Sequence, residues 1–182
     1  NPEGIAVQSE PGTGPGVIWV AHGNTVSKYT FTTAYNDFTE VASITGLNNP
    51  TALDIGGPSN HLFIVEGGNE RILEYDISST PTPAGNFHQF GTTFTRGHLD
   101  DDEFRQVSDV AVASDGRVAV SDIGNFRIQL FDSDANLIYS DHIAWQPAPF
   151  ADKVTSTVHR MMTWGCEYEA DLVNTHPDWM AG

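Results

Sequence analysis

The residues of this chain best suited to chemistry are its carboxylates. Glu66 and Asp122 each close a short apolar run. The longest run of acids consists of Asp100, Asp101, Asp102 and Glu103. Clustered carboxylate oxygens are the ligands that Ca²⁺ prefers, but the spacing here matches no EF-hand loop. The acidic run is therefore a candidate Ca²⁺ site, with a simply hydrated loop as the alternative.

Histidine and cysteine supply no further catalytic signature. The seven histidines are His22, His61, His88, His98, His142, His159 and His176. No two of them have the His-x-His or His-x₃-His spacing of a zinc site. The single cysteine, Cys166, follows Gly165 without a neighbouring histidine, so an inert thiol is expected. One thiol also excludes an internal disulfide framework.

Charge and composition narrow the class of protein. The chain has 182 residues, and 8 Lys and Arg against 24 Asp and Glu give a net charge of −16. This balance argues against a nucleic-acid partner, because phosphate binding relies on clustered basic residues. No apolar run approaches the roughly 18 residues of a membrane span. Lys28 and Lys153 are the only lysines, and this composition favours a secreted or periplasmic protein.

Three segments of the chain resemble one another and predict a repeat architecture. They span about residues 1–46, 47–103 and 104–143, and each contains four short β-like runs separated by turn residues. Runs such as Leu62–Val65 are apolar throughout, as expected of a strand covered on both faces. The Pro-rich stretch Ser79–Gly85 in the second unit predicts an inserted loop. A four-stranded unit of about 40–50 residues with both faces covered is a β-propeller blade.

The repeats resemble the blades of NHL-type β-propellers. In that family the second strand ends in an acid, and a turn with Asn and an Arg-Ile pair follow. The third unit keeps Asp122, Asn125, Arg127, Ile128 and Phe131, and the second keeps Pro50, Glu66, Asn69, Arg71, Ile72 and Tyr75. The first unit has His22 at the acidic position and lacks the arginine. The resemblance implies an all-β propeller, but propellers host many unrelated activities.

The resemblance also implies where the acidic positions lie. In propellers of this type, the loops between second and third strands share one end with the blade-to-blade connections. Glu66, Asp122 and the acidic run are therefore expected on one rim, with His22 beside them, as candidate binding residues. In the alternative interpretation the acids cap their turns and arginines bridge to the next blade. The structural residues would then be Asn69 and Arg71 near Glu66, and Asn125 and Arg127 near Asp122.

Three blades do not close a propeller, which usually has about 4–8. The outer blade faces would be exposed and prone to pairing. We therefore expect a larger propeller, with six blades as a candidate number, completed by the remainder of a longer polypeptide or by other protein subunits. Residues 144–182 leave the repeat pattern, and they predict a partly helical tail that packs on an open blade face or docks a partner subunit.

Two functions remain open on the sequence. The favoured one is a non-enzymatic binding or assembly module that makes protein or ligand contacts outside the cytoplasm. The alternative is part of a metal-dependent enzyme, because the third unit also resembles the peptidyl-α-hydroxyglycine amidating lyases, propellers that use Zn²⁺ and Ca²⁺. In that family a Pro-His-Gly triplet supplies a zinc ligand. The matching triplets Pro2–Gly4, Pro50–Ala52 and Val107–Asp109 contain no histidine, so that site would lie on other blades.

Overall fold

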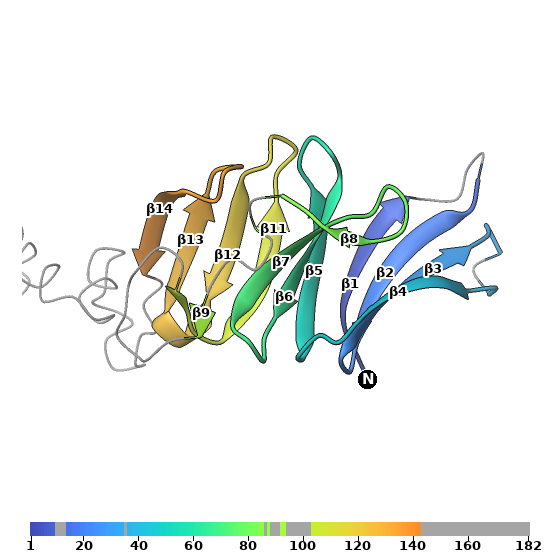
Figure 1. The fold of residues 1–182 in the computed structure, drawn as a ribbon, viewed down its shortest axis with the longest axis horizontal. Coiled ribbons are helices and arrows are strands. Elements are labelled where there is room, and N and C mark those ends of the chain that lie inside the picture. Colours follow the sequence, from blue (N-terminus) through green and yellow to red (C-terminus); the bar gives the residue numbers. More distant parts are fainter. Residues whose placement is uncertain (10–13, 35, 86, 88–91, 94–102, 143–182) are drawn as a thin grey trace, which may run out of the picture.

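The computed structural model describes residues 1–9, 14–34, 36–85, 87, 92–93 and 103–142. These residues form three four-stranded antiparallel sheets, shown in Figure 1. The first contains β1 (Pro2–Ser9), β2 (Gly16–His22), β3 (Thr25–Phe31) and β4 (Thr39–Thr45). The second contains β5 (Pro50–Gly56), β6 (His61–Glu66), β7 (Arg71–Asp76) and β8 (Thr82–Pro83). The third contains β11 (Val107–Val112), β12 (Val118–Asp122), β13 (Arg127–Phe131) and β14 (Leu137–His142).

Within each sheet the strands follow one another in chain order, so each sheet is a meander of hairpins. The turns carry residues suited to them: the β11–β12 turn closes at Gly116, whose φ of 90° strains any other residue. Two smaller elements complete the described structure. The strand β9 (Thr92–Thr93) pairs in parallel with β10 (Glu103–Phe104), and a 3₁₀ helix, η1 (Ile123–Asn125), joins β12 to β13.

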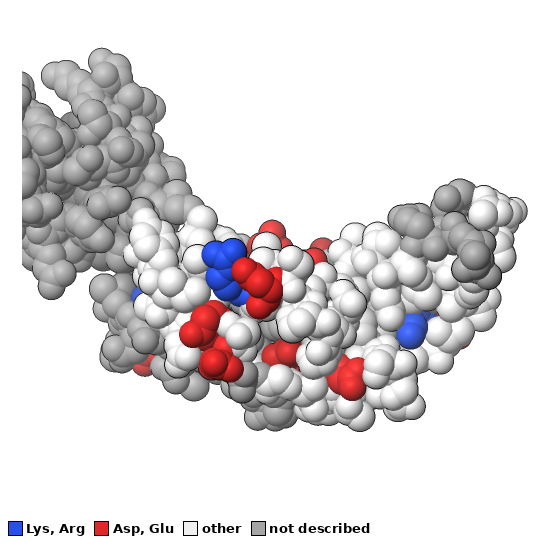
Figure 2. Space-filling view, turned by 90° about the horizontal axis from the view of Figure 1, so that it is seen from above, with Lys and Arg blue, Asp and Glu red and all other residues white. Residues whose placement is uncertain are grey.

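The three sheets pack side by side as the blades of a propeller. Strand β5 lies between β1 and β11, so the first strands of successive blades are neighbours. The later strands fan away from them (Figure 1). Figure 2 shows the described residues as an arc that is hollowed along one side. The predicted all-β architecture of four-stranded blades is confirmed.

The core of the described residues consists of two apolar clusters, one between each pair of adjacent blades. The first cluster is Ala6, Trp19, Ala21, Val26, Ile44, Leu47, Leu53, Leu62, Ile64, Leu73 and Ile77. The second is Ala52, Phe63, Val65, Ile72, Phe87, Phe104, Val107, Val110, Val118, Val120 and Phe131. The middle blade contributes to both clusters, which explains why the run Leu62–Val65 is apolar at every position.

The Pro-rich stretch of the second unit contains the outermost strand of its blade. Thr82 and Pro83 form β8 and pair with Asp76 and Tyr75 of β7. The prediction of an inserted loop over Ser79–Gly85 is therefore wrong for these two residues. Proline is tolerated there because an edge strand has a neighbour on one side only, so a missing N–H costs no ladder hydrogen bond.

The predicted tail, residues 144–182, lies outside the described residues. No helix in the described part of the chain has the length and apolar character needed to cross a membrane.

Candidate functional site

Glu66, a predicted rim residue, ends β6 with a fully buried side chain. Its Oε1 accepts the backbone N–H of Asn48 at 2.8 Å, and its Oε2 accepts from Nε of Arg71. Burial opposes ionisation of Glu66, but hydrogen bonds from Arg71, Asn69 and the Asn48 N–H outweigh it and hold its pKa below the ordinary value. The carboxylate thus ties the entry of the middle blade to its second and third strands.

Asp122 makes the same connection in the third blade. Its Oδ1 accepts the backbone N–H of Arg105, and its Oδ2 accepts from Asn125 Nδ2 and Arg127 Nε, each at 2.8 Å. Asp122 and Arg127 are 0% and 2% exposed, so the ion pair is buried. A further donor of Arg127, Nη2, bonds the carbonyl of Glu103 at 2.7 Å. Both charges therefore lie in a network of hydrogen bonds, as buried charges require.

A second set of hydrogen bonds joins one blade to the next at this rim. In the first blade the turn residue Asn24 accepts the backbone N–H of Asn49 through Oδ1 at 3.3 Å. In the middle blade Glu70 accepts the N–H of Gln106 through Oε1 at 3.2 Å. Asn49 and Gln106 directly precede β5 and β11, and both have left-handed φ values, 53° and 51°. The turn of each blade thus holds the entry to the following one.

These contacts limit what the rim acids can do with a ligand. Every oxygen of Glu66 and Asp122 already accepts a donor from its own blade. Both residues are also 0% exposed, so neither carboxylate presents an oxygen to a ligand at the surface.

Only part of the acidic run lies among the described residues. Residues 100–102 lie outside the described residues, so Asp100, Asp101 and Asp102 are not placed. Glu103 begins β10, where its carbonyl meets Arg127. Among the described side chains, no group of three or more His, Cys, Asp or Glu is arranged to hold a metal ion. The Ca²⁺ site therefore stays a prediction.

His22 occupies the acidic position of the first blade and makes a different network. Its Nε2 lies 2.9 Å from Ser27 Oγ, and that hydroxyl lies 3.2 Å from Glu40 Oε1. A carboxylate can only accept, so Ser27 donates to Glu40 and His22 Nε2 donates to Ser27. In this arrangement His22 is not placed to take the serine proton, as a nucleophile would require. Only Gly23 and Asn24 separate β2 from β3, and Thr25 replaces the arginine of the sister blades.

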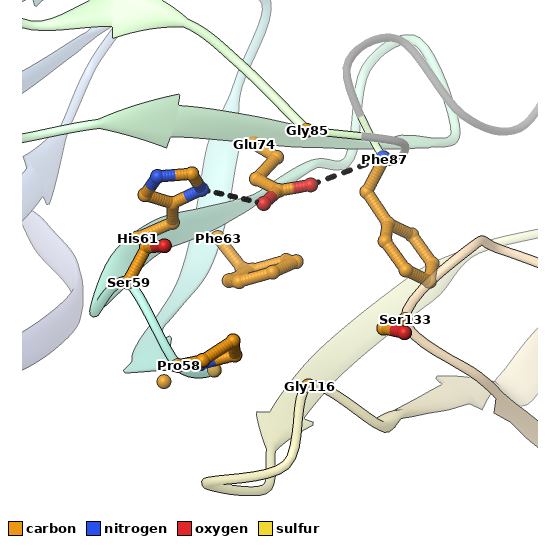
Figure 3. Close-up of a pocket in the computed structure, with 11 residues that line it drawn as sticks. Pro58, Ser59, His61, Phe63, Glu74, Gly85, Phe87, Gly116 and Ser133 are labelled. Atoms are coloured by element: carbon orange, nitrogen blue, oxygen red, sulfur yellow. Dashed lines mark hydrogen bonds and ion pairs between the residues drawn. The ribbon is translucent and has the colours of Figure 1, made fainter.

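A second polar site lies at the other end of the blades, and the sequence motifs do not reveal it. A cavity of about 130 Å³ opens between the middle and third blades. His61 and Glu74 border it, and Nδ1 of His61 lies 2.7 Å from Oε1 of Glu74. Figure 3 shows the ring of Phe63 beneath this pair and the ring of Phe87 on the far side of the cavity. The cavity thus combines a hydrogen-bonded His–Glu pair with aromatic walls.

One signal of this site is present in the sequence. Glu74 interrupts the apolar run of β7, Ile72–Tyr75, at a position where the third blade has Leu130. An acid at a core-facing strand position requires a partner. The partner, His61, is 13 residues away and begins the neighbouring strand. Neither position belongs to the repeat pattern, so the motif comparison does not mark them.

Comparisons with known proteins agree with the architecture. No family model matches the sequence, and no curated protein sequence matches it either. Among solved structures, a protein from Lactobacillus plantarum matches with a TM-score of 0.54 and 11% identity, over 78% of this chain and 42% of that one. Selenomethionine-substituted virginiamycin B lyase from Staphylococcus aureus matches with a TM-score of 0.50 and 17% identity, over 80% of this chain and 42% of that one.

These similarities concern the fold alone. This chain spans less than half the length of either structural neighbour. Together with the three sheets, they identify the described residues as blades of a β-propeller.

Proposed function

We propose that these blades form a non-enzymatic binding and assembly module of NHL-like type, working outside the cytoplasm, whose two outer blade faces are covered by further blades. The acidic, lysine-poor composition supports the location, and the paired acid and arginine of the middle and third blades support the NHL type. The covering blades come from another protein subunit or from the remainder of a longer propeller.

One observation carries the assembly role: the outer faces repeat the apolar pattern that adjacent blades bury against each other. Ile5 of β1 is 62% exposed, and Leu53, which holds the same position in the middle blade, is 7% exposed. On the other flank Ile128 is 39% exposed, whereas its counterpart Ile72 is completely buried. The same strand positions are therefore interface in the middle blade and open surface in its neighbours.

The physical gain from covering these faces is large. Burying one aliphatic side chain of this size stabilises by about 1.5–3 kcal/mol. The blade-to-blade contacts already present show which kind of surface fits: an antiparallel blade with Ile, Leu and Val at the same register positions. Each exposed flank is thus one half of an interface that the chain already makes twice.

The assembly role is tested by the state of the 182-residue chain in solution. We expect self-association, or binding of a hydrophobic dye by a monomer, measured by light scattering and dye fluorescence. Association by the isolated chain would identify a second copy as a source of blades. Dye binding by a monomer would indicate blades from a different polypeptide segment.

Charged substitutions locate the effect. Ile5→Asp and Ile128→Asp each reduce association or dye binding, whereas Ser114→Asp, in an exposed turn, leaves both unchanged. The control matters because added negative charge alone repels copies of a chain that carries −16. A monomer that binds no dye, or equal behaviour of all three variants, would contradict the proposal.

A further inference from the structure

The cavity between the middle and third blades has a position and a composition that suit a ligand. Its rim comprises the β5–β6 turn, Gly116 in the β11–β12 turn and Ser133 in the β13–β14 turn. Its wall includes Phe63, Phe87 and the pair of His61 and Glu74 (Figure 3). All of these residues belong to two blades that pack against each other within this chain, so the cavity needs no further blade to form.

Glu74 presents a buried carboxylate to this cavity. The residue is 7% exposed, and its oxygens accept from His61 Nδ1 at 2.7 Å and from the Phe87 N–H at 3.1 Å. Each carboxylate oxygen can accept two hydrogen bonds, and the described residues supply one donor to each oxygen of Glu74. Neither described partner is an arginine or lysine, in contrast to Glu66 and Asp122.

Aromatic rings form the adjoining walls. Phe63 and Phe87 are 3% and 1% exposed and meet edge to face with their centroids 5.7 Å apart. The face of an aromatic ring carries partial negative charge and attracts cations, most strongly where water is excluded. Phe63 lies directly beneath the carboxylate in Figure 3, so both features act on the same space.

Glycine keeps the cavity open. A Cβ at Gly116 would lie 3.0 Å from the Cβ of Ser133, across the rim of the cavity. A Cβ at Gly85 would lie only 1.9 Å from Oε2 of Glu74, so the backbone itself covers one side of the carboxylate. Glu74 itself lines the cavity, which is where a ligand can approach its carboxylate.

We propose that this cavity binds a guanidinium group at the end of a short aliphatic chain. The planar cation donates parallel hydrogen bonds to the two oxygens of Glu74 and stacks on an aromatic face. The volume of about 130 Å³ is comparable to the roughly 150 Å³ cavity known to hold benzene. An alkyl guanidinium with about as many non-hydrogen atoms as benzene therefore fits.

The charge of the surroundings favours a cation over a neutral or anionic ligand. The chain carries −16, and Figure 2 shows acidic side chains spread over the face of the blades seen there, with basic ones confined to small areas. Such a field raises the local concentration of cations. An anion would meet the Glu74 carboxylate at close range, which costs free energy that no described arginine or lysine on the cavity wall offsets.

The direct test compares ethylguanidinium with its uncharged isostere ethylurea, by saturation-transfer NMR on the complete 182-residue chain. A ligand this small is expected to bind with a Kd on the order of 1 mM, a range that this method measures well. We expect saturable transfer to ethylguanidinium and much weaker transfer to ethylurea. Equal transfer to both, or transfer to neither, would overturn the proposal.

Two substitutions assign the binding to this cavity. Glu74→Gln is expected to weaken ethylguanidinium binding by about tenfold or more, because the charged acceptor is lost. Glu40→Gln is the matched control, because that carboxylate also accepts two hydrogen bonds, from the hydroxyls of Ser27 and Tyr29, but lies in the first blade. Unchanged affinity in Glu74→Gln, with the fold intact by circular dichroism, would refute the assignment.

A second variant covers the case in which Glu74→Gln does not fold. Ser59 is an exposed turn residue on the cavity rim, so Ser59→Lys places a competing cation there without disturbing the core. It is expected to weaken ethylguanidinium binding by about tenfold, and Thr33→Lys, in an exposed turn of the first blade, serves as its control. Equal binding by both lysine variants would count against the proposal.

A last comparison identifies whether the bound guanidinium group belongs to an arginine of a protein or to a free small molecule. Blocked arginine, acetylated and amidated, presents the side chain as a protein would, whereas ethylguanidinium represents a free small molecule. Binding of both identifies an arginine of a partner protein as a suitable ligand, and binding of ethylguanidinium alone restricts the site to free guanidines. If neither shows saturable binding, the inference fails, whatever the outcome for the outer blade faces.

Discussion

Asp122 and Glu74 are both buried acids on the strands of a blade, yet their surroundings differ. Asp122 pairs with the buried guanidinium of Arg127, and it also accepts hydrogen bonds from the Arg105 N–H and from Asn125. Glu74 accepts from a histidine and a backbone N–H, and it borders a cavity. The carboxylate of Asp122 is thus enclosed by donors at one end of the blades, whereas the carboxylate of Glu74 borders a cavity at the other end.

The difference shows how position in a blade decides the role of an acid. At the end with the β2–β3, β6–β7 and β12–β13 turns, the chain must hold the entry of each blade, and the acid serves as the common acceptor. At the opposite end the backbone N–H of Gly57 donates to the carbonyl of Ala113 at 3.0 Å, and a cavity remains among Pro58, Gly116 and Ser133.

Asp122→Ala is expected to cost about 3–5 kcal/mol in the free energy of unfolding, because it leaves the buried Arg127 without its counter-charge. Chemical denaturation measures this. Asp115→Ala removes the acid of an exposed pair with Arg117 in the same blade, and it should leave stability nearly unchanged. Similar losses in the two variants would show that Asp122 does not hold the blade together.

The pKa of Glu66 provides a pH test of the closed end. Because its folded-state pKa lies below the ordinary value of 4.5, Glu66 contributes stability that is present above that value and lost as pH falls through the folded pKa. Unfolding followed by denaturant from pH 7 down to pH 3 should show this fall. In Glu66→Gln the dependence should flatten, and an unaltered profile would rule out this role for Glu66.

Gly116→Ala addresses the open end. We expect a loss of about 1–3 kcal/mol in stability, since alanine is strained at a φ of 90° and its Cβ would lie 3.0 Å from that of Ser133. The same substitution narrows the cavity, so ethylguanidinium binding should weaken as well. Thermal unfolding and saturation-transfer NMR measure the two effects. Gly14→Ala, at an open position with ordinary φ, is the control.

Glu74→Gln should have the smallest effect on stability, about 1 kcal/mol or less, because a glutamine oxygen still accepts a hydrogen bond and no buried arginine loses its partner. Denaturation at pH 7 checks this. A loss as large as that of Asp122→Ala would mean that Glu74 is as important to the stability of its blade as Asp122 is, and the two acids would then have the same role.

The sequence repeats are the reason that the four-stranded blades can be predicted from the sequence. The runs around Leu62–Val65 and Val118–Val120, with their turns, predict four-stranded blades because strand periodicity and turn residues are local properties. The strand β8 is missed because Thr82 and Pro83 have no strand pattern of their own and pair only since β7 lies beside them. A two-residue edge strand depends on its neighbour.

The candidate site residues also fall into two groups: those that the sequence pattern marks and those that only the tertiary structure brings together. The residues around Asp122 and Arg127 stand out because they recur at one spacing in two units. His61 and Glu74 recur nowhere, and their cavity arises only where Gly116 and Ser133 of the next blade approach. A pattern within one unit cannot indicate a space that is enclosed by two.

The sequence by itself determines the individual four-stranded blade. Apolar alternation, glycine turns and an acid five residues before an arginine all act over short stretches of chain. The packing of one blade against the next decides whether a blade face is core or surface and whether an acid is enclosed or borders a cavity. Burial and electrostatics depend on what surrounds a group, and those surroundings come from segments distant in sequence. For that reason Ile72 lies in the core and Ile128 at the surface. In the same way Asp122 is fully buried, whereas Glu74 lines a cavity.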